Sequence, residues 1–111
     1  MAVRSEQFAA GRRTDATLAV VYSVPDGKTA ILKDLVFFNL STSATVEVLV
    51  AIDAGTFNQT VFFEQTLSAR QRVRLEAWTV LPPFAEIAVR GEASKSFNYW
   101  ISGAELLGVS I

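Results

Sequence analysis

The chain of 111 residues carries a formal net charge of −1; half of its residues are hydrophobic and 19% are charged. This length and composition fit one compact domain, residues 1–111, with a real apolar core, and they exclude two packed domains and argue against disorder. The absence of Cys and His excludes disulfides, thiol nucleophiles, His-based acid–base pairs and most zinc sites. We therefore expect no enzyme activity, no catalytic residue, no metal ligand and no cofactor.

The N-terminus lacks the apolar run of a secretory signal, and no stretch approaches the roughly 18 apolar residues of a transmembrane helix. We expect synthesis in the cytoplasm and no membrane as partner. The near-zero net charge gives no general attraction to nucleic acid either.

Apolar residues alternate with polar ones at a period of two, and turn-forming clusters interrupt the pattern about every ten residues. This pattern predicts an all-β fold, a single antiparallel β-sandwich or jelly roll of seven to nine short strands. The expected strands cover residues 17–24, 29–38, 45–53, 60–67, 72–81, 86–91 and 96–102, with further pieces at 3–9 and 104–110.

Two turns carry clear local chemistry. Pro25, Asp26 and Gly27 predict a hairpin corner, because proline presets φ and glycine supplies a positive φ. Pro82 and Pro83 end the strand before them, since neither residue can donate to a ladder.

Alternation also assigns the faces of the strands. Val46, Val48, Val50 and Ile52 share one face, which we expect to form part of the core. The strand at 29–38 is apolar on both faces, with Ile31, Leu35 and Phe37 opposite Leu32, Val36 and Phe38. Such a strand is either central and partly covered by the N-terminal segment, or it exposes a patch that packs against another subunit.

Several apolar side chains fall on faces that the alternation directs outward: Leu49, Phe62, Trp78 and Trp100. The apolar C-terminus, residues 106–111, either completes the protein's own sheet or adds a strand to a neighbour. The expected subunit contacts are Phe38, Phe62, Trp78, Trp100, Leu106, Leu107, Val109 and Ile111.

Arg70, Arg72 and Arg74 share one face of a strand if the alternation holds, beside Trp78. Basic groups next to an aromatic ring suit single-stranded nucleic acid, but cross-strand pairing with Glu47 or Glu86 explains the same pattern. We favour the pairing. The acidic residues are scattered, and no carboxylate pair suited to general acid–base catalysis emerges.

The segment from Val21 to Leu35, followed by Phe38-Asn39 and a Ser/Thr-rich turn, resembles small β-sandwich virion proteins of tailed bacteriophages, in which a Tyr-x-Val-Pro-x-Gly-Lys-Thr hairpin opens the domain. Residues 78–82 and 99–105 are also similar to that group. The chain departs from it after Pro82, where Phe84 and Ala85 stand in place of a Pro-Gly-Asp-like corner. The resemblance implies a structural component of the particle, on the head surface or in the tail, with no catalytic residues to transfer.

These observations predict a non-enzymatic structural protein of the virion that binds capsid or tail neighbours through apolar strand faces and its termini. We expect other virion proteins as partners and a homo-oligomer such as a trimer. The alternative is a carbohydrate-binding module for host attachment. In that case Trp78, Trp100 or Phe57 stacks on a sugar ring, and Asn58 and Gln59 supply hydrogen bonds.

Overall fold

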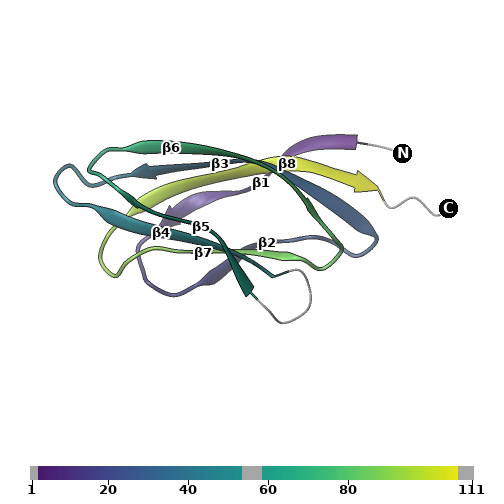
Figure 1. Ribbon diagram of the computed structural model, residues 1–111, viewed down its shortest axis with the longest axis horizontal. Coiled ribbons are helices and arrows are strands. Elements are labelled where there is room, and N and C mark those ends of the chain that lie inside the picture. Colours follow the sequence, from purple (N-terminus) through teal and green to yellow (C-terminus); the bar gives the residue numbers. More distant parts are fainter. Residues whose placement is uncertain (1–2, 54–58, 108–111) are drawn as a thin grey trace.

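Eight strands form two four-stranded antiparallel sheets that pack face to face in a computed structural model, which describes residues 3–53 and 59–107 (Figure 1). Sheet A contains, in spatial order, β1 (Val3–Arg13), β8 (Phe97–Leu107), β3 (Lys28–Asn39) and β6 (Arg72–Leu81). Sheet B contains β2 (Ala19–Ser23), β7 (Glu86–Arg90), β4 (Val46–Asp53) and β5 (Gln59–Leu67).

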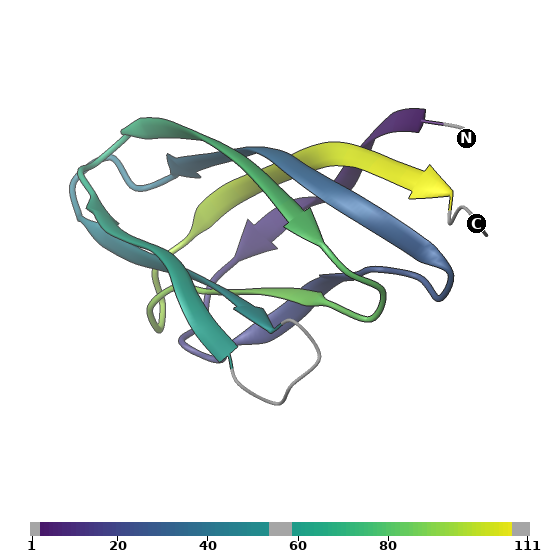
Figure 2. The ribbon, with the colours of Figure 1, turned by 45° about the vertical axis from the view of Figure 1, so that its right-hand side comes forward.

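The chain passes from one sheet to the other after every strand except β4, which pairs with β5 in sheet B (Figure 2). Strand orders 1-8-3-6 and 2-7-4-5 define an eight-stranded jelly roll. The predicted fold class is confirmed. The described residues contain no helix, so none of them forms a helix able to span a membrane.

The core lies between the two sheets and is built from the inward residues of all the central strands. Phe37 of β3 is fully buried and packs against Phe63 of β5 and Phe97 of β8, with ring centroids 5.5 and 6.2 Å apart. Val46, Val48 and Val50 are fully buried, as the alternation predicts. Ile52 also packs against the core, whereas Leu49 lies on the outer face of sheet B and is nevertheless only 7% exposed.

Strand β3 departs from the predicted alternation at Lys33. In its pairing with β8, Leu32 lies opposite Gly103 and Asp34 opposite Ser102, so Lys33 is an extra residue. This β-bulge shifts the phase of the strand and turns Leu32 toward the core, on the same side as Leu35 and Phe37. The prediction that Leu32 and Leu35 face opposite ways is therefore wrong.

All four edge strands contain an extra residue relative to their neighbours: Phe8 in β1, Val21 in β2, Phe62 in β5 and Ala77, beside Trp78, in β6. Each of these apolar side chains packs against the core. The expectation that Phe62 points outward is consequently wrong, because the bulge turns its ring toward the open side of the sandwich.

Strand β8 runs without a break through Gly103, where two separate pieces were predicted. A Cβ at Gly103 would collide with the carbonyl oxygen of Ile31, so the glycine permits close contact between β8 and β3 instead of ending the strand. The apolar C-terminus thus completes the protein's own sheet as far as Leu107. Val109 and Ile111 lie outside the described residues.

The turn at Pro25–Lys28 has the predicted backbone, with Gly27 at a φ of +76° and the Lys28 amide donating to the Pro25 carbonyl. It joins β2 to β3, which belong to different sheets, so it is a corner of the sandwich and not a hairpin. The backbone of Val24 binds the backbones of Phe84 and Ala85 and fixes this corner to the turn after β6.

Phe84 occupies the left-handed position of the turn between β6 and β7. Its φ is +69° and the Ala85 amide donates to the Pro82 carbonyl at 3.1 Å, which is the geometry of a type II turn with Pro83 before the left-handed residue. A bulky residue is strained in this conformation.

We predict that Phe84→Gly raises the free energy of unfolding by about 0.5 kcal/mol, because the relief of backbone strain exceeds the entropic cost of glycine. The ring is 63% exposed, so little burial is lost. Urea denaturation measures the change. Phe84→Ala is the control, since alanine keeps the strain; equal effects of both variants would contradict the prediction.

Candidate interaction surface

The outer face of sheet A collects apolar, aromatic and cationic side chains from all four of its strands. Pairing across the sheet aligns these residues in rows, because residues opposite one another share a face. From β1 to β6 the rows are Arg12–Asn98–Phe38–Arg72, Ala10–Trp100–Val36–Arg74 and Gln7–Ser102–Asp34–Glu76.

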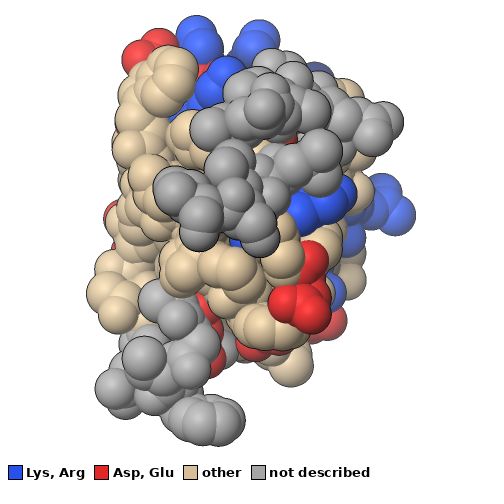
Figure 3. Space-filling view, turned by 90° about the vertical axis from the view of Figure 1, so that its right-hand side faces the viewer, with Lys and Arg blue, Asp and Glu red and all other residues tan. Residues whose placement is uncertain are grey.

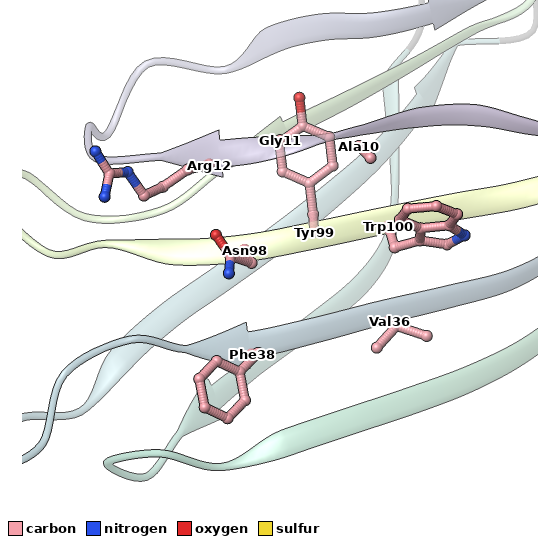
Figure 4. Close-up of a pocket in the computed structure, with 8 residues that line it drawn as sticks. All are labelled: Ala10, Gly11, Arg12, Val36, Phe38, Asn98, Tyr99 and Trp100. Atoms are coloured by element: carbon pink, nitrogen blue, oxygen red, sulfur yellow. The ribbon is translucent and has the colours of Figure 1, made fainter.

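Trp100 stands in the middle of this face, between Ala10 and Val36 (Figure 4). Its side chain is 49% exposed. On the β1 side, a depression of about 520 Å³ is lined by Ala10, Arg12, Asn98 and Trp100 among others. A second depression, of about 420 Å³, lies between Trp100, Val36, Phe38 and Arg72. The small side chain of Ala10 leaves Trp100 open on that flank.

Trp78 lies on β6 at the bulge opposite Lys33, with a φ of +47°. Its ring is 66% exposed, and the Lys33 ammonium lies 5.5 Å from the ring centroid, close enough for a cation–π contact. A tryptophan in the left-handed region is strained, and such strain persists where the surrounding structure enforces it. Val80, two residues farther along β6, is also a largely exposed apolar side chain, at 65%.

The three arginines that were expected to share one strand face make different contacts. Arg70 precedes β6 in a turn, with a φ of 59°, and its guanidinium lies 4.8 Å from the Phe38 ring centroid. Arg74 binds Asp34 of β3 at 2.9 Å and Glu76 at 3.6 Å. Arg72 is exposed at the end of the Phe38 row.

The predicted partners of these arginines are wrong. Glu47 pairs with Arg90 at 3.6 Å, and Glu86 accepts a hydrogen bond from Ser23, both within sheet B. Sequence alone could not show that β6 lies beside β3, which carries Asp34.

Five cationic side chains, Arg12, Lys33, Arg70, Arg72 and Arg74, and two carboxylates, Asp34 and Glu76, belong to the outer face of sheet A. Its net charge is therefore +3, in a protein of net charge −1. Among the described residues, no group of three Asp or Glu side chains is placed to hold a metal ion. Exposed aromatic side chains flanked by cations are typical of a surface that contacts another macromolecule.

The structure brings Phe38, Trp78 and Trp100 together on this face, where the sequence predicted contacts. Leu106 lies farther along β8 and is partly buried, whereas Phe62 belongs to sheet B. The Leu107 side chain is outside the described part of the structure. So are Phe57 and Asn58, while Gln59 begins β5 in sheet B.

Sequence reasoning missed Ala10, Arg12 and Asn98 beside Trp100. The predicted first strand ended at residue 9, because residues 9–13 read Ala-Ala-Gly-Arg-Arg and show no alternation of apolar and polar side chains. Only the pairing of β1 with β8 places them beside Trp100.

Neither a protein-family model nor a curated protein matches this sequence. Among solved structures, a pilus protein of Bacillus endospore appendages, described as disulfide-linked, is similar with a TM-score of 0.52 and 10% identity, over 96% of this chain and 89% of that one. A chain of the T13 viral particle of infectious bursal disease virus gives 0.57 and 11%, over 94% of this chain and 30% of its own.

A chain from the Gx strain of the same virus gives a TM-score of 0.54 at 14% identity, over 96% of this chain and 33% of its own. The protein thus spans about a third of the two viral chains. At these identities the similarity shows the fold alone: a β-sandwich shared with protein chains of pili and viral particles.

Electrostatics also fix the loop between β7 and β8. The Glu92 carboxylate accepts a 2.6 Å hydrogen bond from the Glu47 amide and binds the Lys95 ammonium at 3.1 Å. These interactions, the amide bond first, lower the pKa of Glu92 below its ordinary value.

We predict that Glu92→Gln lowers stability at neutral pH and that the difference disappears in acid. A carboxyl whose pKa is lower in the folded state stabilises the protein above its unfolded pKa, and this contribution is lost as the pH falls through the folded pKa. Thermal unfolding between pH 7 and pH 2 tests this, with Glu64→Gln as the control. A difference that persists unchanged in acid would contradict the assignment.

Proposed function

We propose that this protein is a non-enzymatic structural component of a tailed-phage virion, and that it binds capsid or tail neighbours through the outer face of sheet A. The observation that carries the proposal is the group of exposed aromatic and apolar side chains on that face. Trp100, Trp78 and Val80 are 49%, 66% and 65% exposed, and the partly buried Phe38 and Val36 flank Trp100 on β3. Large exposed apolar side chains that gather on one face favour an interaction site.

Two further observations support a structural role. Jelly rolls recur in viral capsids, which raises the expectation of such a role by fold analogy. The corner from Tyr22 to Thr29, which carries the resemblance to phage virion proteins, has its expected positive φ at Gly27. Because the chain contains no Cys, it forms no disulfide bond with a neighbour.

Burial of the exposed side chains of this face would stabilise such contacts. A tryptophan has a side-chain surface of about 200 Å², and covering its exposed half contributes about 2 to 3 kcal/mol at 25 cal/mol per Å². Arg12 and Arg72 at the two ends of the Phe38 row favour a partner with acidic groups around an apolar centre.

Peptide mass spectrometry on density-purified particles tests the proposal, with copy number measured against the major capsid protein. Many copies per particle would support decoration of the head, and a few would support a place in the tail. Complete absence from the particles would overturn the proposed function.

The contact assignment has its own test. We predict that Trp78→Ala combined with Trp100→Ala reduces incorporation into particles at least tenfold, while the free protein stays folded because the side chains are 66% and 49% exposed. Phe84→Ala removes another exposed ring, in the turn after β6 and outside the paired rows of this face, and should leave incorporation unchanged. Normal incorporation of the double variant would show that this face is not the contact.

The depression beside Trp100 supports carbohydrate binding as a second candidate function. An aromatic ring with the Asn98 amide and the Arg12 guanidinium around a hollow of about 520 Å³ offers both stacking and hydrogen bonds to a sugar. A glycan array would show binding that Trp100→Ala abolishes and Trp78→Ala preserves. An array without binding excludes this function for the glycans displayed.

A further inference from the structure

The two outer faces of the sandwich carry opposite charge. On the outer face of sheet B, the outward strand residues include the carboxylates of Glu47, Asp53, Glu64 and Glu86 against the single guanidinium of Arg90, a net charge of −3. The outer face of sheet A has a net charge of +3. Figure 3, which views one end of the sandwich, shows Lys and Arg gathered along the upper side, where sheet A lies, and Asp and Glu mostly lower.

We propose that copies of this chain associate front to back, with the outer face of sheet A of one copy on the outer face of sheet B of the next. The inference rests on the proposed structural role and names a second copy as the partner of the same surface. It follows from the charge of the faces and the state of the sheet edges.

The sheet edges are closed to strand addition. A strand that joins an edge needs a regular row of free amides and carbonyls, and a bulge interrupts that row. Each of the four edge strands contains a bulge, at Phe8, Val21, Phe62 and Ala77. The two outer faces therefore remain as the broad surfaces for contact between copies.

Charge selects between the ways in which two faces can meet. Two sheet A faces against each other would oppose Arg12 and Arg72 of one copy with the same cations of the other. Two sheet B faces would likewise oppose carboxylates. Only the pairing of sheet A with sheet B brings the net charges of +3 and −3 together, which is the complementarity seen across specific interfaces.

The two faces differ in size. The strands of sheet A are 10 to 12 residues long, whereas β2 and β7 of sheet B have 5 residues each and β4 and β5 have 8 and 9. With strands about 4.8 Å apart and about 3.3 Å per residue, the sheet B face covers roughly 430 Å², about half of the 800 Å² per partner of a standard interface. Its exposed apolar side chains are Val20 and Val61 on the two edge strands, 49% and 58% exposed, and they are apolar counterparts for Trp100 of the next copy.

A front-to-back contact is heterologous, since each copy uses two different surfaces. Repetition yields a ring if the rotation between copies closes and an open stack if it does not. Both outcomes fit a protein that is present in several copies at one place.

Charge reversal with mixing tests the inference on the purified full chain at low ionic strength, by sedimentation velocity. The sheet A variant is Arg12→Glu with Arg72→Glu, and the sheet B variant is Glu64→Arg with Glu86→Arg. Each variant alone should associate at least tenfold more weakly than the wild type. Mixed together, they should associate again, because the unaltered sheet A face of one variant meets the unaltered sheet B face of the other. Asp26→Arg changes charge at the corner between β2 and β3, away from both faces, and should leave association unchanged.

The results separate this inference from the proposed function. A wild-type chain that stays monomeric at high concentration and low salt, or variants that associate as the wild type does, would overturn front-to-back stacking. Wild-type association that both variants lose and that mixing fails to restore would also overturn it and would indicate an isologous contact. Presence in purified particles decides the virion role whatever the outcome of the mixing experiment.

Discussion

The contact of Phe37 with Phe63 and Phe97 joins the two sheets at their centre, and the rest of the molecule depends on it. Phe37 belongs to sheet A and Phe63 to sheet B, so burying these rings holds the layers face to face. Removal of such a ring typically costs 3 to 5 kcal/mol, a large share of the stability of a small domain. Once the inner faces are committed to this core, only the outer faces and the edges remain for other molecules.

The edges are then used to finish the core. An open sandwich exposes its apolar interior along both sides, and here each edge strand inserts one extra apolar residue toward that gap, such as Phe8, which stacks on Tyr22 at 4.2 Å. The same bulges break the regular backbone pattern that an added strand requires. The bulges of the edge strands thus complete the core and leave the outer faces for association.

Two residues with strained backbone conformations position side chains on the outer face of sheet A. Arg70 and Trp78 both have positive φ, and these conformations set the guanidinium over Phe38 and the indole beside Lys33. Left-handed residues of this size are uncommon and persist only when neighbouring contacts hold them. Phe84, strained in the same way, serves the turn after β6 instead, where its amide binds the Val24 carbonyl.

Alternation and turn chemistry in the sequence determined the all-β class, most strand positions, the burial of Val46, Val48 and Val50 and the positive φ of Gly27, because these depend on residues adjacent in the chain. Phe38, Trp78 and Trp100 were predicted as contacts on the same basis. Only the tertiary structure decided that Arg12, Asn98, Phe38 and Arg72 form one row, that Phe62 turns inward and that the two outer faces differ in charge. Strand order and bulges arise from pairing between segments far apart in sequence, and a local pattern contains no information about which strand lies beside which.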